Sequence, residues 1–282
     1  MKFQLKRLLT QFFIFLSANL RPFGVKTGFC YPFFYCNACP SATSACPLRP
    51  LEVSVYKFTQ SESGIKWSLL LFPIAILGLI GALSGRAVCG WACPIGLLQR
   101  GTGKIARKFK KYPLFKKMGK HPIEKYLRYI KYINLIGLVF VTSALIGFYF
   151  TDICPIGFLT GTIPTLLLFP GKYGPSSYFW IALVIFILFL ILIFLIERGW
   201  CRYFCPVGAI LAPFNKISLM HITRVPEETF QKECLHCNAC SNICPMGIDV
   251  VKINRDPECI LCGKCIEVCP KNLIKYSRGQ KE

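Results

Sequence analysis

Residues 234–270 read CLHCNACSNICPMGIDVVKINRDPECILCGKCIEVCP, and they hold eight of the 17 cysteines in this chain of 282 residues. The eight cysteines form two runs of one pattern, in which gaps of two, two and three residues separate four cysteines and a proline follows the fourth. The first run has Cys234, Cys237, Cys240 and Cys244, and the second has Cys259, Cys262, Cys265 and Cys269. Two-residue gaps let a tight loop present three thiolates to the corners of one cube, and the proline then turns the chain away.

This spacing is that of bacterial ferredoxins with two [4Fe-4S] clusters, in which each cluster takes three thiolates from one run and the fourth from the other. The crossover predicts Cys234, Cys237, Cys240 and Cys269 for cluster 1, and Cys259, Cys262, Cys265 and Cys244 for cluster 2. A pair of zinc sites is the alternative, because CxxC pairs also suit tetrahedral zinc. The duplicated order of eight cysteines favours iron–sulfur clusters. We therefore predict a two-cluster ferredoxin-like domain over residues 224–278.

The rest of the chain is apolar enough to predict a membrane domain. The sequence is 54% hydrophobic with a mean hydropathy of +0.48, too apolar for an ordinary soluble domain. Residues 67–85, 132–151 and 173–196 have the length and composition of bilayer-crossing helices. The segment 8–20 is shorter than a typical bilayer-crossing helix, and it spans only if the flanking arginines reach opposite interfaces. The alternative is an amphipathic helix that lies on the membrane surface. We predict a mainly α-helical fold, with a four-helix transmembrane bundle over residues 1–220.

Charge predicts how this bundle is oriented. The 100–131 loop carries twelve Lys or Arg against one acid, Glu124, so the positive-inside rule makes it cytoplasmic. The 152–172 loop has one Lys and one Asp and is assigned to the outer face. Four spans then place both termini and the ferredoxin domain on the cytoplasmic side of the cell membrane, in a multi-pass protein. The net charge of +21 is attributed to basic residues that face anionic membrane lipid, so no nucleic acid partner is expected.

A short element that begins with Cys-Pro recurs four times along the membrane domain. Each copy has apolar residues at the second and fifth positions after the cysteine. Three of the four copies have glycine at the third position after it. The copies begin at Cys46, Cys93, Cys154 and Cys205. Proline suits the first position of a helix, and a cysteine before it would cap that helix. The repeat predicts two tandem parallel halves, roughly 1–110 and 125–215, each with one outer and one inner element.

The two inner elements are the fuller copies, since each reads C-x3-C-P just after a predicted span. Four cysteines from the two halves are enough for one shared redox site: Cys89, Cys93, Cys201 and Cys205. A cluster, a redox-active dithiol or a four-thiolate zinc site would each use them. At the outer face, a second redox site is predicted from Cys36, Cys39, Cys46 and Cys154, with Cys30 as the other candidate for the fourth ligand. Disulfides are the alternative there.

The order of these motifs resembles one known family. The segment from Arg86 to Pro94, the segment from Glu197 to Ala209 and the two cysteine runs that follow are similar to NapH-type membrane polyferredoxins. The resemblance implies four helices, two C-x3-C-P motifs, two cytoplasmic [4Fe-4S] clusters and electron exchange between the quinone pool and partner redox proteins. The outer cysteines depart from that family and suggest an additional outer redox centre.

Missing motifs narrow the function further. The three histidines lie outside the predicted spans, no CxxCH occurs, and neither a P-loop nor a G-x-G-x-x-G fingerprint is present, so haem, nucleotide and NAD chemistry lack support. We predict a membrane-bound electron-transfer protein with two [4Fe-4S] clusters and one or two further iron–sulfur centres. Its partners would be membrane lipid, a membrane redox protein or complex, and quinone. The alternatives are a redox-regulatory or metal-cofactor assembly protein that uses the C-x3-C-P cysteines, or a non-catalytic anchor for a ferredoxin module.

Overall fold

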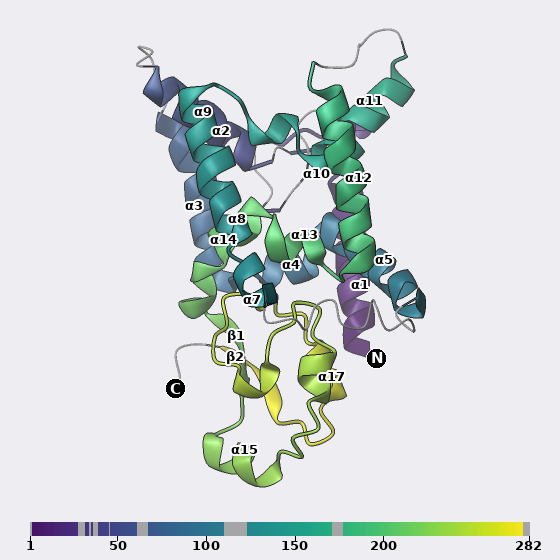
Figure 1. The fold of residues 1–282 in the computed structure, drawn as a ribbon, viewed down its shortest axis with the longest axis vertical. Coiled ribbons are helices and arrows are strands. Elements are labelled where there is room, and N and C mark those ends of the chain that lie inside the picture. The colour runs from purple at the N-terminus through teal and green to yellow at the C-terminus, as the bar shows by residue number, and fades with distance from the viewer. Residues whose placement is uncertain are drawn as a thin grey trace.

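The computed structural model describes residues 2–27, 32–33, 35, 39–44, 46–60, 67–109, 123–170 and 177–278. Most of these residues are helical, as predicted, and the cysteine-rich C-terminal part lies at one end of an elongated molecule (Figure 1). Both ends of the chain lie near that same part in Figure 1. The opposite end carries α2 and α11.

The first half of the chain contributes α1 (Lys2–Ser17), η1 (Arg21–Phe23), α2 (Leu48–Thr59), α3 (Trp67–Ser84), α4 (Ala87–Trp91) and α5 (Pro94–Phe109). The second contributes α7 (Ile123–Leu127), α8 (Ile130–Asn134), η2 (Leu135–Val141), α9 (Thr142–Leu145), η3 (Phe150–Asp152), α10 (Pro155–Gly157), η4 (Phe158–Thr162), α11 (Ile163–Leu168), α12 (Phe179–Leu195), α13 (Gly199–Tyr203), α14 (Pro206–Leu211) and η5 (Pro213–Lys216). As predicted, every Cys-Pro element begins a helix: α2, α5, α10 and α14.

Helices cover most of each predicted span, with shifted ends. The segment 8–20 belongs to α1, which starts and ends earlier, and 67–85 is α3. The segment 132–151 is interrupted after Leu145, because Gly147 adopts a φ of +68° and ends the helix, and helical structure resumes at Phe150. Within 173–196, the helix is α12.

Length and hydropathy single out a different stretch. Among the described residues, Phe150–Leu168 is the one helical stretch long and apolar enough to cross a membrane, and 70–84, 130–145 and 179–195 are shorter apolar helices. Most of Phe150–Leu168 lies in the 152–172 segment, which is therefore largely helical. The reason is the Cys-Pro element at Cys154, after which the backbone enters α10, η4 and α11.

Equivalent helices of the two halves pack against the opposite half. The inner Cys-Pro helix α5 packs on α12 of the second half, and its counterpart α14 packs on α3 of the first. Likewise α1 contacts α4 and α5, as α8 contacts α13 and α14. This packing gathers the short helices α4, α13 and α14 at the centre of the molecule (Figure 1).

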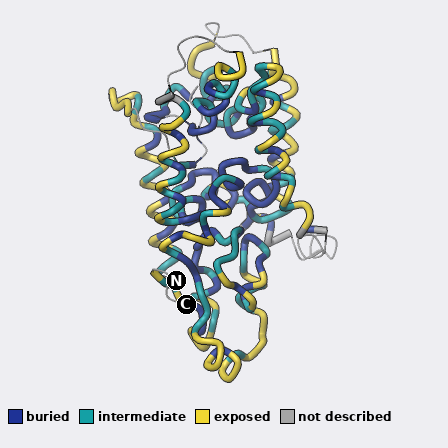
Figure 2. Tube along the Cα trace, turned by 90° about the vertical axis from the view of Figure 1, so that its left-hand side faces the viewer, coloured by how far each residue is buried: buried dark blue, intermediate teal, exposed yellow. Residues whose placement is uncertain are grey.

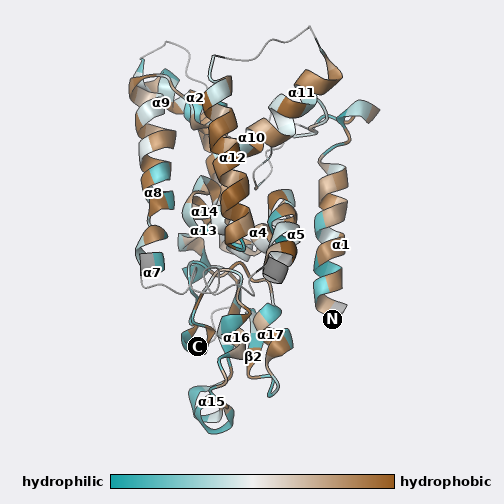
Figure 3. Cartoon of the chain, turned by 45° about the vertical axis from the view of Figure 1, so that its right-hand side comes forward, coloured by the Kyte–Doolittle hydropathy of each residue, from teal (hydrophilic) through white to brown (hydrophobic). Residues whose placement is uncertain are grey.

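Apolar side chains lie on the outside of this helical part, and polar ones lie within it. The helix α12 is apolar along its length (Figure 3) and exposes Trp180, Ile181 and Leu188. Inside, Arg7, Gln11 and Gln99 are almost completely buried, and Figure 2 shows buried backbone concentrated along the centre. A soluble domain of this size rarely exposes so much contiguous apolar surface.

The C-terminal part is held by a two-stranded antiparallel sheet. Strand β1 (Met220–Arg224) pairs with β2 (Ile274–Arg278) in the register Met220 to Arg278. Between the strands lie α15 (Glu227–Glu233), α16 (Ala239–Asn242), η6 (Val250–Lys252) and α17 (Lys264–Val268). Closing the sheet brings the start and end of this part together, so the two cysteine runs lie against each other.

Candidate iron–sulfur sites

Each predicted crossover set of the C-terminal part lines its own cavity. One cavity is lined by Cys259, Cys262, Cys265 and Cys244 with apolar side chains such as Ile222 and Ile260; we call these four cysteines the proximal set. The other is lined by Cys234, Cys237, Cys240 and Cys269 with Phe230 and Leu273; these are the distal set. In both cavities the fourth cysteine comes from the other run, in the arrangement that the spacing predicts.

The thiols of each set influence one another. Burial, with the neighbouring thiols of Cys262 and Cys244, raises the pKa of Cys265 to about 12. Burial also raises the pKa of Cys240, and Cys269 adds to that rise. Thiolates that share an apolar space repel one another, and this repulsion disfavours their ionisation. Cationic iron bound between them would offset the repulsion. Four cysteines and an apolar lining fit a [4Fe-4S] cluster in both cavities.

The two sets differ in exposure. Cys262 and Cys265 are buried, whereas Cys237 is exposed and the other distal cysteines are half-buried. Cys262 of the proximal set belongs to the same buried core as the helical part, whereas the distal set shares its cavity with Phe230 of α15, the helix at the free end of the molecule (Figure 1).

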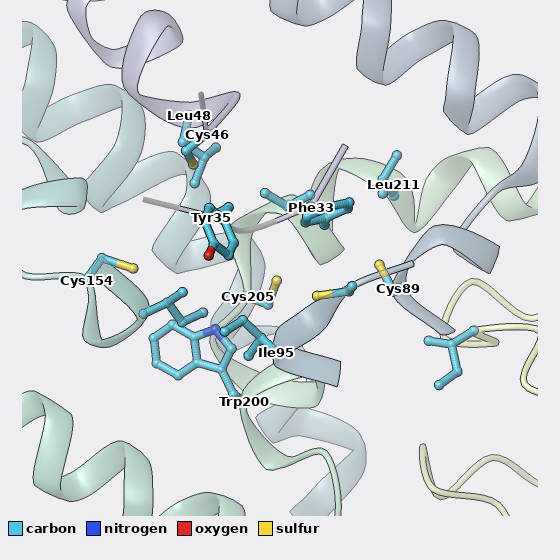
Figure 4. Packing of buried hydrophobic residues seen from close by; sticks show 14 of the residues in the cluster. Phe33, Tyr35, Cys46, Leu48, Cys89, Ile95, Cys154, Trp200, Cys205 and Leu211 are labelled. Atoms are coloured by element: carbon cyan, nitrogen blue, oxygen red, sulfur yellow. The ribbon is translucent and has the colours of Figure 1, made fainter. Parts of the chain in front are cut away.

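The four cysteines of the two C-x3-C-P motifs lie in the helical part of the chain; we call Cys89, Cys93, Cys201 and Cys205 the inner set. All are buried. Burial raises the pKa of Cys93 to about 12, and the thiols of Cys201 and Cys89 contribute. Burial raises the pKa of Cys205 as well, and the other three thiols of the set add to it. Thiols from both halves therefore influence one another, and Figure 4 shows Cys89 and Cys205 in the same buried core.

Hydrogen-bond donors point at the inner sulfurs. The amide of Gly208 donates to Cys205 Sγ over 3.2 Å, and Gln99 Nε2 donates to Cys201 Sγ over 3.3 Å. The Nε atom of Arg86 is buried and has no hydrogen-bond partner among the described residues. Such donors stabilise negative charge on sulfur, so the inner set fits an anionic, thiolate-ligated group.

Two arginines cross between the halves at this site. Arg86 and Arg198 each stand three residues before the first cysteine of a C-x3-C-P motif. Arg198 Nη1 donates to the carbonyl oxygen of Cys89 over 2.8 Å, and Arg86 Nη2 donates to that of Cys201 over 3.3 Å. A Cβ on Gly96 would lie 2.9 Å from Arg198 Nη2, and one on Gly208 would lie 3.0 Å from Arg86 Nη2. The glycine of the inner elements therefore makes room for the arginine of the other half.

Both C-x3-C-P motifs also touch the proximal set, through the residue after the first cysteine. In the first half this residue is Gly90, where a Cβ would lie only 2.1 Å from the carbonyl oxygen of Ile260. In the second half it is Arg202, whose Nε and Nη2 both donate to the carbonyl oxygen of Pro245. Ile260 and Pro245 each adjoin a proximal cysteine, so the inner and proximal sets are in direct backbone contact.

Buried ion pairs fix the same interface. Glu258 pairs with Arg86 over 2.8 Å and also with Lys131. Arg202 pairs with Glu124 over 2.6 Å. Burial works against the charge of Glu258, yet the two cations lower its pKa. The C-terminal part is therefore held firmly on the helical part.

These contacts correct our interpretation of the basic loop. Arg100 lies on α5, is buried and donates to the carbonyl oxygen of Gln4. Arg128 and Lys131 contact Gly247 and Glu258 of the C-terminal part. Arg128 and Lys131 therefore hold the C-terminal part on the helical part, and Arg100 joins α5 to α1. Residues 110–122 of the predicted loop lie outside the described residues.

At the predicted outer site, the structure describes three of the cysteines. Cys39, Cys46 and Cys154 are buried in one core, near Tyr35 (Figure 4). The Sγ atom of Cys39 lies 3.0 Å from Ser41 Oγ. Cys30 and Cys36 lie outside the described residues. Among the described residues, no three His, Cys, Asp or Glu side chains converge as ligands of one metal ion; the ligands of a four-iron cube bind separate iron atoms.

The arginines, Glu258 and Gln99 are the site residues that sequence reasoning missed. The signal for the arginines was available, because both C-x3-C-P motifs extend to R-x2-C-x3-C-P-x-G. No local pattern marks Glu258 or Gln99, since their partners are far away in the sequence.

Comparison with known proteins also indicates iron–sulfur binding. Residues 65–112 and 178–224 both match one family model, described as a 4Fe-4S binding domain, and residues 254–275 match another with that description. The first model covers α3–α5 and again α12–α14, so it includes both inner motifs. The sequence repeat is therefore confirmed, and [4Fe-4S] clusters are the cofactor of this chain.

Several relatives are similar over the same region. An uncharacterized protein of Methanocaldococcus jannaschii is 30% identical over 186 residues, 65% of this chain and 68% of the relative. The ferredoxin-type protein NapH of Haemophilus influenzae is 27% identical over 63% of this chain and 54% of the relative. The methylamine utilization ferredoxin-type protein MauN of Methylorubrum extorquens is 29% identical over 57% of this chain and 48% of the relative.

No solved structure matches the chain. Its matched region spans about half the length of the NapH and MauN relatives. The chain belongs to the NapH-type polyferredoxins, as its motif order predicts.

Proposed function

We propose that this chain is a membrane-embedded iron–sulfur protein that carries electrons between its ferredoxin domain and a redox partner in the membrane or at the outer face. The main support is one continuous buried core that contains Cys39, Cys46 and Cys154, most of the inner set and Cys262 of the proximal set. [4Fe-4S] clusters exchange single electrons at potentials that their surroundings adjust. The cysteine sets are arranged in a series from the distal end inward.

The inner set would hold a third [4Fe-4S] cluster. Both segments that match a 4Fe-4S binding domain contribute two of its cysteines. Its buried thiols, the donors from Gly208 and Gln99 and the unpartnered Nε of Arg86 all suit an anionic cluster. The direct contact of Gly90 with Ile260 keeps this set next to the proximal one.

A membrane would surround the helices α1, α3, α8–α9 and α12. All four expose large apolar side chains, for example Phe13, Leu79, Ile133 and Trp180. The lipid-facing surface would then be apolar while the buried centre is polar, as expected in a bilayer. The ferredoxin domain and both termini would lie in the cytoplasm, and α2 and α11 at the outer face.

The partners follow from the exposed parts of the series. A redox protein or complex would meet the distal set, where Cys237 is exposed. Membrane lipid would cover the apolar helices, and quinone is a candidate reactant within the membrane. The outer cysteines would complete the series, with Cys36 as the fourth member of the set.

Iron and acid-labile sulfide per chain, measured with EPR spectra of the reduced full-length protein, test this function. We expect at least twelve iron atoms per chain, four for each of three clusters. Cys89→Ser should remove the signal of one cluster and leave the two ferredoxin signals in place. Eight iron atoms with no effect of Cys89→Ser would favour an anchor, and stoichiometric copper in place of additional iron would favour a metal-assembly protein.

A further inference from the structure

The inner set is surrounded by more buried positive charge than the protein itself neutralises. Arg7, Arg86 and Arg198 are each at most 1% exposed. Arg86 forms an ion pair with Glu258, and the same carboxylate also pairs with Lys131. Arg7 and Arg198 donate to backbone carbonyls and Gln4, and within the described chain they pair with no carboxylate.

These arginines lie against the cysteines of two sets. Arg198 donates to the carbonyl oxygens of Cys89 and Gly96. Arg7 Nε donates to the carbonyl oxygen of Gly90 over 2.6 Å, between two inner cysteines. Positive charge thus crowds at the junction of the inner and proximal sets.

A buried guanidinium without an anion is strongly unfavourable, because the desolvation cost is not repaid. A thiolate-ligated cluster carries net negative charge and gains another when it is reduced. Nearby fixed cations stabilise that reduced form and so raise the reduction potential. Burial alone would disfavour the more highly charged reduced form and lower the reduction potential. The fixed cations oppose this effect of burial.

The distal set has no comparable surroundings. Lys271 is the charged residue that lines its cavity in the described chain, and this side chain is exposed to water. The helix α15 that leads to Cys234 carries three glutamates and one lysine. The electrostatic difference between the two ends of the series is therefore built into the chain.

We propose that the buried arginines Arg7, Arg86 and Arg198 make the inner set the electron acceptor for the two ferredoxin sets. Electrons then enter at the exposed distal set from a one-electron donor protein and move inward. One electron leaves the distal centre, which is oxidised, and the inner centre is reduced by one electron. This inference rests on the proposed function, because it requires a redox centre at the inner set.

EPR-monitored redox titration of the full-length protein, purified in detergent, tests the proposal. The inner component is identified as the one that Cys89→Ser removes. We expect it to have the highest midpoint potential of the three in the wild-type protein. Arg198→Gln should lower that potential by at least a tenfold change in its reduction equilibrium, 59 mV for one electron. Arg198→Lys, which keeps the charge, should retain most of the wild-type value.

Lys232→Gln is the matched control, because it removes one positive charge from exposed α15 and should leave the inner potential unchanged. The proposal is overturned if the inner component has the lowest potential in the wild-type protein, a result that needs no variant to fold. It is also overturned if Arg198→Gln has full iron content and an unchanged inner potential. An iron content of two clusters only would refute the inner centre itself, which is the separate failure of the proposed function.

Discussion

Replacing Gly90 with alanine should weaken the junction between the helical part and the ferredoxin domain. The Cβ of an alanine would lie 2.1 Å from the carbonyl oxygen of Ile260, whereas ordinary contact begins near 3.4 Å. The two backbones would therefore have to separate by about 1.3 Å. Neither can yield easily, because Arg7 and Gln11 hold the carbonyl of Gly90 and Asn215 holds that of Cys259.

The expected cost follows from these contacts. Overpacking of this kind typically costs ~1–3 kcal/mol, and alanine returns up to ~1 kcal/mol through its higher helix propensity. We expect a net destabilisation of the junction of ~1–2 kcal/mol, with faster amide exchange over residues 258–263. Hydrogen exchange measured by mass spectrometry on the purified full-length protein reads this directly.

Gly101→Ala is the matched control, since Gly101 lies in α5 of the same half and a Cβ there meets no atom of the described residues within 4 Å. This variant should keep the exchange of 258–263 at the wild-type rate. If Gly90→Ala exchanges as slowly as the wild-type protein, the close approach of α4 to Ile260 does not occur in solution, and the reasoning fails.

Three further predictions address other parts of the chain. Cys262→Ser should remove the EPR signal of the proximal cluster and Cys237→Ser that of the distal cluster, and loss of both signals in either variant would contradict the separate cavities. Burial raises the pKa of Glu52 to about 7, so folding favours its protonated form, and its contribution to stability is lost as pH rises from about 4.5 through 7. The wild-type protein should lose on the order of 3 kcal/mol over that window, thermal unfolding of Glu52→Gln should lack this loss, and equal pH profiles would count against it. Cysteine labelling in intact cells should report out, in, out and in at residues near 60, 115, 165 and 280, and an inside location near 60 would remove the first span.

Local spacing predicts ligand sets because it reflects short-range geometry. The gaps around Cys259, Cys262 and Cys265 determine how a loop wraps one cavity, and Cys-Pro at Cys205 determines where α14 begins. The same pattern predicts that Cys244 joins the cysteines of the second run, because each run of a two-cluster ferredoxin supplies the fourth ligand of the other cluster. These features depend on residues that are near in sequence or on an established pattern.

Long-range contacts were not predictable in the same way. Lys131 was read as a lipid-facing residue of a basic loop, yet it pairs with Glu258 at a separation of 127 residues. Trp200 and Tyr203 follow a predicted span, where aromatic side chains often lie at the membrane interface, yet both are only 5% exposed and are buried in the centre. Composition indicates that a segment is basic or aromatic, but only the folded arrangement decides what it faces.

The two halves show how a symmetric repeat can serve an asymmetric task. Cys89 and Cys201 are equivalent in the repeat, and so are the arginines that precede them. The next position differs, because Gly90 leaves space for Ile260 while Arg202 reaches out to the carbonyl oxygen of Pro245. The symmetric positions build one site between the halves, and the asymmetric position fits that site to a ferredoxin domain that exists only once in the chain. Exchanging these two residues would keep the composition of the repeat and should still abolish the docking of the proximal set.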